Sequence, residues 1–326
     1  RYRWIDGEVV MAVASDILIP GYGDDYVTTM RLWAARSSRE FNLTHFNQGD
    51  YIGAVEAKVL GETISKVLYP SDEATAGKEL RLKQQYFFVA ATLHDILRRY
   101  RKQSQSFDAF PDFVAIQLND THPAIAIAEL MRLLVDGEKL GWDDAWRICE
   151  RTFAYTNHTV MPEALESWPV DLLGNLLPRH LELIGEINHR FLQLLSERFP
   201  QETDLPARLS IFQEGAQRAV RMAHLAIIGS HTVNGVAALH SDILKTDLFR
   251  DFNRVFPDRF KNVTTGITPR RWLKQANPSL SQLITSVVGP KGICDLDRLT
   301  ELVPHAEDPA FREAWRQAKK ENKKRL

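Results

Sequence analysis

The sequence predicts an α/β fold in which helices cover both faces of a mostly parallel sheet. Short apolar strands alternate with amphipathic helices through the middle of the chain, beginning with strands at 113–118 and 152–156. Alternation at this spacing is typical of parallel strands joined by right-handed crossovers. Polar residues follow these strands directly where they end. No internal repeat or low-complexity segment interrupts the pattern, so we expect one compact layered domain.

The first 50 residues are predicted to be rich in β-structure. Two apolar strands are expected within 9–19, and a Pro-Gly turn then leads into a strand at 28–33. Residue 1 lies in what resembles a hairpin already under way, and residues 319–326 are the middle of a charged helix without a stop signal. We therefore expect a fragment of a longer protein, with 306–326 as the beginning of a helix that leads to a further domain.

Residues 51–100 are predicted to contain two helices and a loop. Apolar residues at intervals of three and four predict helices at 55–68 and 78–100. The sequence Tyr69-Pro-Ser-Asp, followed by polar residues up to Gly77, breaks the pattern between them and predicts a flexible loop. This stretch is therefore expected as helix, loop and helix.

Residues 107–305 are predicted to form the alternating core. Proline costs no hydrogen bond in the first turn of a helix, because the first N–H groups have no intrahelical partner there. We therefore expect helices to begin at Pro123 and Pro162, each after a polar strand end, and their free N–H groups to face one cleft. In this core we expect helices at 123–135, 142–149 and 181–199. We expect further strands at 222–228 and just before Val263.

Composition and charge are those of an ordinary globular protein. The chain has 326 residues, 44% hydrophobic and 25% charged, and 41 basic against 42 acidic residues give a net charge of -1. This balance favours neither nucleic acid nor an anionic membrane as a partner, so we expect a small or neutral ligand. The sequence has no apolar run long enough to span a bilayer and no amino-terminal signal pattern. Cys149 and Cys294 lie far apart and form no CxxC pair, which favours the cytoplasm and argues against a zinc ribbon or a disulfide framework.

Two strand ends supply the candidate binding residues. Asp120 and His122 follow the first core strand, and Asn157 and His158 follow the second. In parallel α/β sheets, ligands bind beyond the carboxyl ends of the strands. Two ends that each bear an Asx residue and a histidine therefore predict one wall of a cleft. The plainer interpretation is that Asp120 and Asn157 cap the helices that follow, and these residues by themselves leave both interpretations open.

Other kinds of site match the sequence less well. Asp and His are ordinary zinc and iron ligands, yet neither histidine has helical ligand spacing and no HExxH or HxH occurs. Motifs for dinucleotides, nucleoside triphosphates and serine hydrolysis are absent, and Asp120 has no second carboxylate opposite it, as glycoside hydrolases need. Asp72 in the loop and Arg81 on the next helix could reach a cleft, although such residues are commonly solvated surface charges.

Six segments, in order along nearly the whole chain, carry a resemblance to a known family. The sequence resembles the glycogen phosphorylase family of α-glucan phosphorylases, and most of all a bacterial member. The segments are 69–86 (YPSDEATAGKELRLKQQY), 116–123 (IQLNDTHP), 154–166 (AYTNHTVMPEALE), 177–180 (LPRH), 233–241 (VNGVAALHS) and 266–272 (GITPRRW).

The resemblance implies a retaining glycosyltransferase. A glucosyl unit would pass from the non-reducing end of an α-1,4-glucan such as glycogen or maltodextrin to inorganic phosphate, giving glucose 1-phosphate. The chain would be the incomplete N-terminal Rossmann-like half of a two-domain (GT-B-type) architecture, in a full-length protein that forms a homodimer. The cofactor would be pyridoxal 5'-phosphate, whose own phosphate relays the proton, which accounts for the missing carboxylate pair. Its attachment lysine would lie in a carboxyl-terminal domain that this sequence lacks, so we expect the fragment alone to be inactive.

The resemblance also implies roles for individual residues. His158 resembles the catalytic histidine that binds the glucosyl unit, with its backbone carbonyl near the anomeric carbon where positive charge develops. Asp120, His122 and Asn157 resemble one wall of the sugar pocket, and Glu163 lies beside it.

The loop before the second helix resembles a mobile gate over the site. Asp72 matches its acidic residue, and Arg81 stands on the gate or phosphate side. Ser71 and Glu73 flank Asp72 where animal enzymes have asparagines, and Thr265 stands where many relatives have asparagine. The helix at 55–68 resembles the tower helix of dimer contacts.

Two alternatives remain open at this stage. A non-catalytic carbohydrate-binding module would use the same strand ends without the cofactor. A metal-dependent hydrolase would use Asp120, His122 and His158 as ligands and would contain bound metal.

Overall fold

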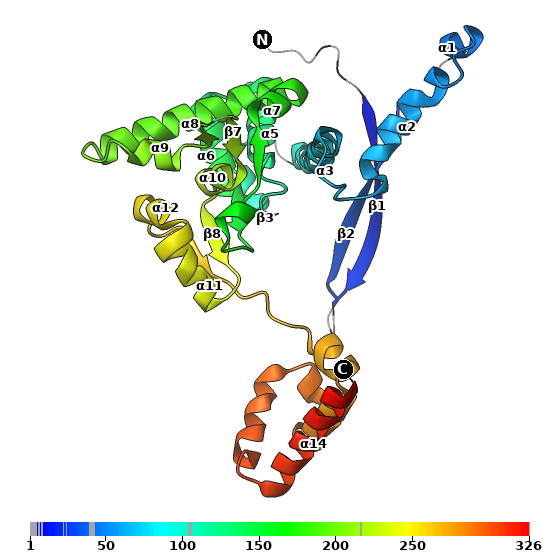
Figure 1. Ribbon diagram of the computed structural model, residues 1–326, viewed down its shortest axis with the longest axis vertical. Helices are drawn as coiled ribbons and strands as arrows, with labels where there is room; N and C mark the ends of the chain where they lie inside the picture. Colours follow the sequence, from blue (N-terminus) through cyan, green and yellow to red (C-terminus); the bar gives the residue numbers. More distant parts are fainter. Residues whose placement is uncertain are drawn as a thin grey trace. The chain divides into compact units, whose positions relative to one another are not determined.

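The computed structural model describes residues 5, 7, 9–21, 23, 25–38, 43–103, 106–215 and 217–325. The chain divides into two compact units, Arg1–Val263 and Thr264–Leu326. In the second unit, orange to red in Figure 1, the regular elements of the described residues are all helices. Its elements are η4 (Arg270–Gln275), α13 (Pro278–Val288), η5 (Pro290–Ile293), η6 (Leu296–His305) and α14 (Pro309–Arg325). The part of the predicted alternating core that lies beyond Val263 is therefore helical.

The first unit contains a four-stranded parallel sheet. Its strands are β3 (Ile116–Asn119), β4 (Phe153–Thr156), β8 (Thr232–Gly235) and β9 (Phe260–Asn262), paired in this order. Each strand contributes a buried side chain to the core, namely Leu118, Tyr155, Val233 and Phe260. Apolar strands of this kind are expected where helices cover a parallel sheet. The predicted mixed α/β fold with a parallel sheet is confirmed.

Helices of the first unit share one apolar core with this sheet. Helix α5 is buried on nearly every side, since all its residues from Ala126 to Met131 are inaccessible to solvent or nearly so. The helices of this core include α3 (Thr75–Arg101), α5 (Ala126–Arg132), α6 (Trp142–Thr152), α8 (Pro178–Arg198) and α10 (Met222–Ile228). Shorter elements of the same unit are α4 (Phe110–Phe113), η1 (Leu133–Gly137), α7 (Val170–Leu176), α9 (Leu205–Leu209), β6 (Phe212–Gln213), β7 (Ala219–Arg221), α11 (Ala238–Ile243), η3 (Leu244–Leu248) and α12 (Arg250–Val255).

A long antiparallel ribbon precedes the parallel sheet along the chain. Strands β1 (Val10–Pro20) and β2 (Val27–Ser37) pair over their whole length, in place of three shorter predicted strands. Arg31 on β2 binds Asp16 and, at 2.6 Å, Asp95 on α3, and Trp33 Nε1 donates to the hydroxyl of Thr92 on α3. Because an isolated two-stranded ribbon is marginally stable in water, these contacts with α3 stabilise it. The chain continues through α1 (Leu43–Asn47) and α2 (Gly53–Lys66).

Two predicted elements of the core are wrong. Residues 222–228, expected as a strand, form helix α10, and the strand follows at β8. Six of the seven residues of α10 are buried, and a short continuous apolar run does not distinguish a strand from a buried helix. The helix expected from Pro162 is a single turn, η2 (Pro162–Ala164), followed by β5 (Ser167–Pro169). There the antiparallel pairing of Trp168 with Val220 on β7 replaces helix propagation.

The helix expected from Pro123 begins at Ala126, after a turn that contains the proline. Each helix in the described part of the chain is too short or too polar to cross a lipid bilayer.

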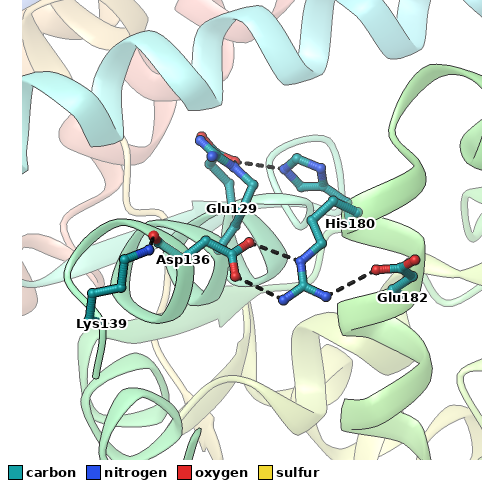
Figure 2. A network of polar contacts seen from close by, with 7 residues as sticks. Glu129, Asp136, Lys139, His180 and Glu182 are labelled. Atoms are coloured by element: carbon teal, nitrogen blue, oxygen red, sulfur yellow. Dashed lines mark hydrogen bonds and ion pairs between the residues drawn. The ribbon is translucent and has the colours of Figure 1, made fainter. Parts of the chain in front are cut away.

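A buried carboxylate connects three helices of the core. Glu129 on α5 is inaccessible to solvent and accepts two hydrogen bonds from Arg132, at 2.7 and 2.9 Å. Nε2 of His180, on α8, donates to the same carboxylate at 2.7 Å (Figure 2). His94 on α3 lies 3.7 Å from its other oxygen. The charge of Glu129 is therefore matched from α5, α8 and α3.

Burial and hydrogen bonding act on Glu129 in opposite directions. Burial by itself would raise its pKa, but the hydrogen bonds from Arg132 and His180, with the nearby ring of His94, outweigh this effect and lower the pKa. Close by, Arg179 donates to both oxygens of Asp136 at 2.9 Å and to Glu182 at 3.0 Å (Figure 2). Charge-assisted bonds of this forked kind are among the strongest polar contacts in proteins.

Replacing Glu129 by glutamine should destabilise the fold by about 3–5 kcal/mol near neutral pH, because the bonds from Arg132 and the buried His180 then lose their charged acceptor. A carboxylate with a lowered pKa stabilises the folded state above its ordinary pKa of 4.5, and this contribution is lost as the pH falls through the lower folded value. The difference between Glu129→Gln and wild type in urea unfolding should therefore shrink as the pH falls below 4.5.

The matched control is Glu182→Gln, which alters an exposed ion pair of the same cluster. We expect it to change the free energy of unfolding by less than about 1 kcal/mol. Equal losses in the two variants would contradict the importance of the buried carboxylate.

Candidate functional site

The predicted strand ends meet at one edge of the sheet. Strands β3 and β4 are parallel neighbours in which Asn119 pairs with Thr156, so Asp120 and Asn157 leave the sheet side by side. The backbone N–H of Asp120 donates to the carbonyl of Thr156 at 3.0 Å. Across the same two strands, Nε2 of His158 bonds to Oδ1 of Asn119 at 2.6 Å. The parallel pairing therefore brings Asp120, Asn157 and His158 together.

Asp120 adopts an unusual backbone conformation. Its φ of 62° lies in the left-handed region, which few residues other than glycine, asparagine and aspartate occupy. Its carboxylate accepts from the N–H of the next residue, Thr121, at 2.6 Å. Helix α5 begins only at Ala126 and has no side-chain cap. Asp120 thus shapes a turn at the strand end and does not cap the following helix.

Asn157 is fully buried and bonded on several sides. Its Nδ2 donates to the hydroxyl of Tyr155 at 3.1 Å, and its Oδ1 accepts from the N–H of Thr159 at 3.0 Å. Nε2 of His240 reaches the same oxygen at 3.1 Å. The backbone N–H of Asn157 bonds to the carbonyl of Asn234 on β8. Asn157 therefore supports the strand end from within, while the next residue, His158, is exposed.

His122 belongs to a neighbouring group that includes the predicted gate loop. Its Nδ1 is hydrogen bonded to the hydroxyl of Tyr69 at 3.2 Å. Arg81 lies over the ring of Tyr69 and donates to the carboxylate of Asp72 at 3.0 Å. These contacts surround a hollow of about 150 Å³. It is lined by Leu68, Tyr69, Arg81, Gln84, Gln85, Phe88, Val89, His122 and Pro123.

Gly77 allows the gate loop to pack closely against α3. A Cβ at this position would lie 1.8 Å from the carbonyl oxygen of Ser71, an impossible contact for any other residue. The loop residue Tyr69 has a φ of 56°. The glycine and the turned backbone together direct Tyr69 and Asp72 toward Arg81.

Sequence reasoning missed Glu166, which lies beside this group. Its carboxylate accepts from Nε2 of Gln85 at 2.8 Å, and the Thr121 hydroxyl lies 3.5 Å away. Burial raises the pKa of Glu166, while the bond from Gln85 and the charges of His122 and Arg81 act in the opposite direction. Glu166 lies in the segment 154–166, directly before β5. No local sequence pattern there indicates that its side chain is buried near His122.

The remaining predicted residues are distributed differently. Glu163 is exposed in the turn η2, and Thr265 lies in the second unit. The three proposed metal ligands each bond to a different partner: Asp120 to Thr121, His122 to Tyr69 and His158 to Asn119. Over the described residues, no group of three His, Cys, Asp or Glu side chains is placed to hold a metal ion.

The fold and this site define an α/β protein with a polar edge at the carboxyl ends of its parallel strands. The chain belongs to the carbohydrate phosphorylase family, since residues 1–326 match the model of that family throughout. It is 55% identical to glycogen phosphorylase of Saccharomyces cerevisiae, over 99% of this chain and 36% of the relative. It is 54% identical to the liver form of Homo sapiens and 53% identical to the muscle form of Oryctolagus cuniculus, over 98% of this chain and 39% of each relative.

The predicted family is thereby confirmed, and the particular similarity to a bacterial member stays a prediction. This chain spans between 36% and 39% of the length of these three relatives.

Replacing Asp120 by alanine should destabilise the fold by about 1–2 kcal/mol, because alanine is strained in the left-handed region and lacks the acceptor for the Thr121 N–H. Asp120→Asn retains both features and should remain within about 0.5 kcal/mol of wild type. Asp120→Gly relieves the strain alone and should fall between the two. Urea unfolding of the three variants checks this order, and equal losses would contradict a conformational role of Asp120.

Proposed function

We propose that this chain supplies the glucan-binding side of an α-1,4-glucan phosphorylase. The reaction would transfer the non-reducing-end glucosyl unit of glycogen or maltodextrin to inorganic phosphate with retention, releasing glucose 1-phosphate. The observation that supports this most is the meeting of Asp120, Asn157 and His158 at one sheet edge in a chain of the phosphorylase family. The imidazole of His158 and the carboxylate of Asp120 suit the hydroxyl groups of a sugar, since together they offer a donor and acceptors, while the buried Asn157 supports the strand end between them.

His158 is the proposed catalytic residue of this chain. An amide oxygen accepts hydrogen bonds and does not donate them, so the bond to Asn119 places the ring proton of His158 on Nε2. Nδ1 then keeps a lone pair that can accept from a sugar hydroxyl. The backbone carbonyl of His158, in the same segment, would face the anomeric carbon and favour the positive charge that develops there.

The neighbouring group around Arg81 is the proposed gate. Asp72 and Tyr69 come from the loop before α3, and both contact Arg81. Asp120, His122 and Glu163 would line the sugar pocket beyond it. Arg81 adds a cation on this side, where an anionic group of the substrate would pass.

The residues at this edge do not fit the phosphate group of pyridoxal 5'-phosphate. Asp120 brings a carboxylate to this edge, and negative charge repels a phosphate. We therefore place the attachment lysine and the phosphate ligands in another domain of the full-length protein, in a two-domain glycosyltransferase architecture. Within that protein, α2 would contribute to contacts between two subunits. The cytoplasm is the proposed compartment.

The proposal is tested by phosphorolysis of maltoheptaose, followed as glucose 1-phosphate, with the protein as its gene encodes it. We expect turnover by that protein and none by residues 1–326 alone. His158→Ala should lower kcat by at least about 10²-fold, because it removes a group that touches the reacting sugar.

The matched control is His189→Ala, which removes an exposed histidine of α8 and should leave kcat unchanged. Turnover by residues 1–326 alone would contradict the need for a second domain. Calorimetric binding of maltoheptaose without any turnover in the whole protein would instead favour a carbohydrate-binding module.

A further inference from the structure

His240 connects the two residues that flank His158. It lies on α11, and its Nε2 is 3.1 Å from Oδ1 of Asn157 and 3.2 Å from the backbone carbonyl of Thr159. Both atoms are acceptors in this arrangement, since the same Asn157 oxygen already receives the N–H of Thr159. One N–H of His240 is therefore shared between the two sides of the segment 157–159.

The other ring nitrogen determines where the proton resides. The backbone N–H of Val236 donates to Nδ1 of His240 at 3.0 Å. A nitrogen that accepts a hydrogen bond bears a lone pair, so the proton of the neutral ring is on Nε2. That is the tautomer that the bonds to Asn157 and Thr159 require. The two ends of the ring therefore specify one orientation and one tautomer.

The helix that bears His240 is itself tightly placed against the sheet. At Gly235, the end of β8, a Cβ would lie 2.5 Å from the Ser241 hydroxyl and 2.9 Å from its backbone N. The Ser241 hydroxyl is 3.0 Å from Oδ1 of Asn262, at the end of β9. The close approach that glycine permits thus fixes α11 relative to two strands, and it places the neighbouring His240 beside the end of a third, β4.

We propose that His240 is a positioning residue that holds the segment 157–159 so that His158 meets the sugar in its reactive geometry. This inference rests on the proposed function of His158. His240 would not touch the substrate itself. It would act through Asn157 and Thr159, whose polar atoms it joins, and a small displacement of a catalytic group is enough to lose much of its effect on the transition state.

The test compares three substitutions in the protein as its gene encodes it. His240→Phe retains a ring without either hydrogen bond, His240→Gln retains a donor near the position of Nε2, and His240→Asn retains an acceptor near the position of Nδ1. We expect kcat for phosphorolysis of maltoheptaose to fall about 10²-fold in His240→Phe and His240→Asn. His240→Gln should recover most of this loss, and KM for phosphate should stay within about twofold of wild type throughout.

The control is His231→Gln, which changes an exposed histidine before the opposite, amino end of β8 and should leave kcat and KM unchanged. Thermal unfolding of each variant separates loss of fold from loss of positioning. Equal kcat in His240→Gln and His240→Phe would overturn the inference. Full recovery of kcat in His240→Asn would also overturn it, because that result would mean that His240 only accepts the hydrogen bond from Val236.

A second measurement does not depend on activity. In long-range proton–nitrogen correlation spectra of protein labelled with ¹⁵N-histidine, the resonances that vanish in His240→Gln should show the pattern of a proton on Nε2. A proton on Nδ1 would overturn the inference. Absence of phosphorolysis in the wild-type protein would refute the proposed function, and the spectrum would still decide the tautomer on which the positioning of 157–159 depends.

Discussion

The polar edge of the sheet depends on backbone hydrogen bonds that continue the strand pairing past the strand ends. The N–H of Asp120 bonds to Thr156, that of Asn157 to Asn234, and that of Val263 to Gly235. Each bond extends the parallel pairing by one residue past the regular strand. The polar residues are thereby fixed to the sheet by their backbones, which leaves their side chains to contact one another and a ligand.

Two buried glutamates show how the surroundings give the same type of side chain different properties. Glu129 is matched by Arg132 and His180, and its pKa is lowered in spite of its burial. Glu166 receives its strongest bond from the neutral amide of Gln85, and burial raises its pKa. The first arrangement stabilises a charge in the core and connects helices. The second is a buried carboxyl group whose pKa is raised by burial, although the charges of His122 and Arg81 act in the opposite direction.

Much of the candidate site was predictable because it depends on local sequence. An apolar strand followed by Asx and His made Asp120, His122, Asn157 and His158 candidates, and parallel alternation predicted that the two strand ends lie at one edge. The helix expected after Pro162 failed because the pairing of β5 with β7 involves residues far apart in sequence. The strand expected at 222–228 failed because six buried apolar residues have no periodicity that separates helix from strand.

The sequence by itself determined the α/β class and the polar strand ends, because these follow from short patterns of apolar, proline and Asx residues. The family followed from its resemblance over six longer segments. Only the tertiary structure decided which distant side chains meet. Glu166 reaches Gln85 across 81 residues, and His240 reaches Asn157 across 83. The physical reason is that a hydrogen bond depends on distance and direction in space, and the packing of α3 and α11 against the sheet sets both.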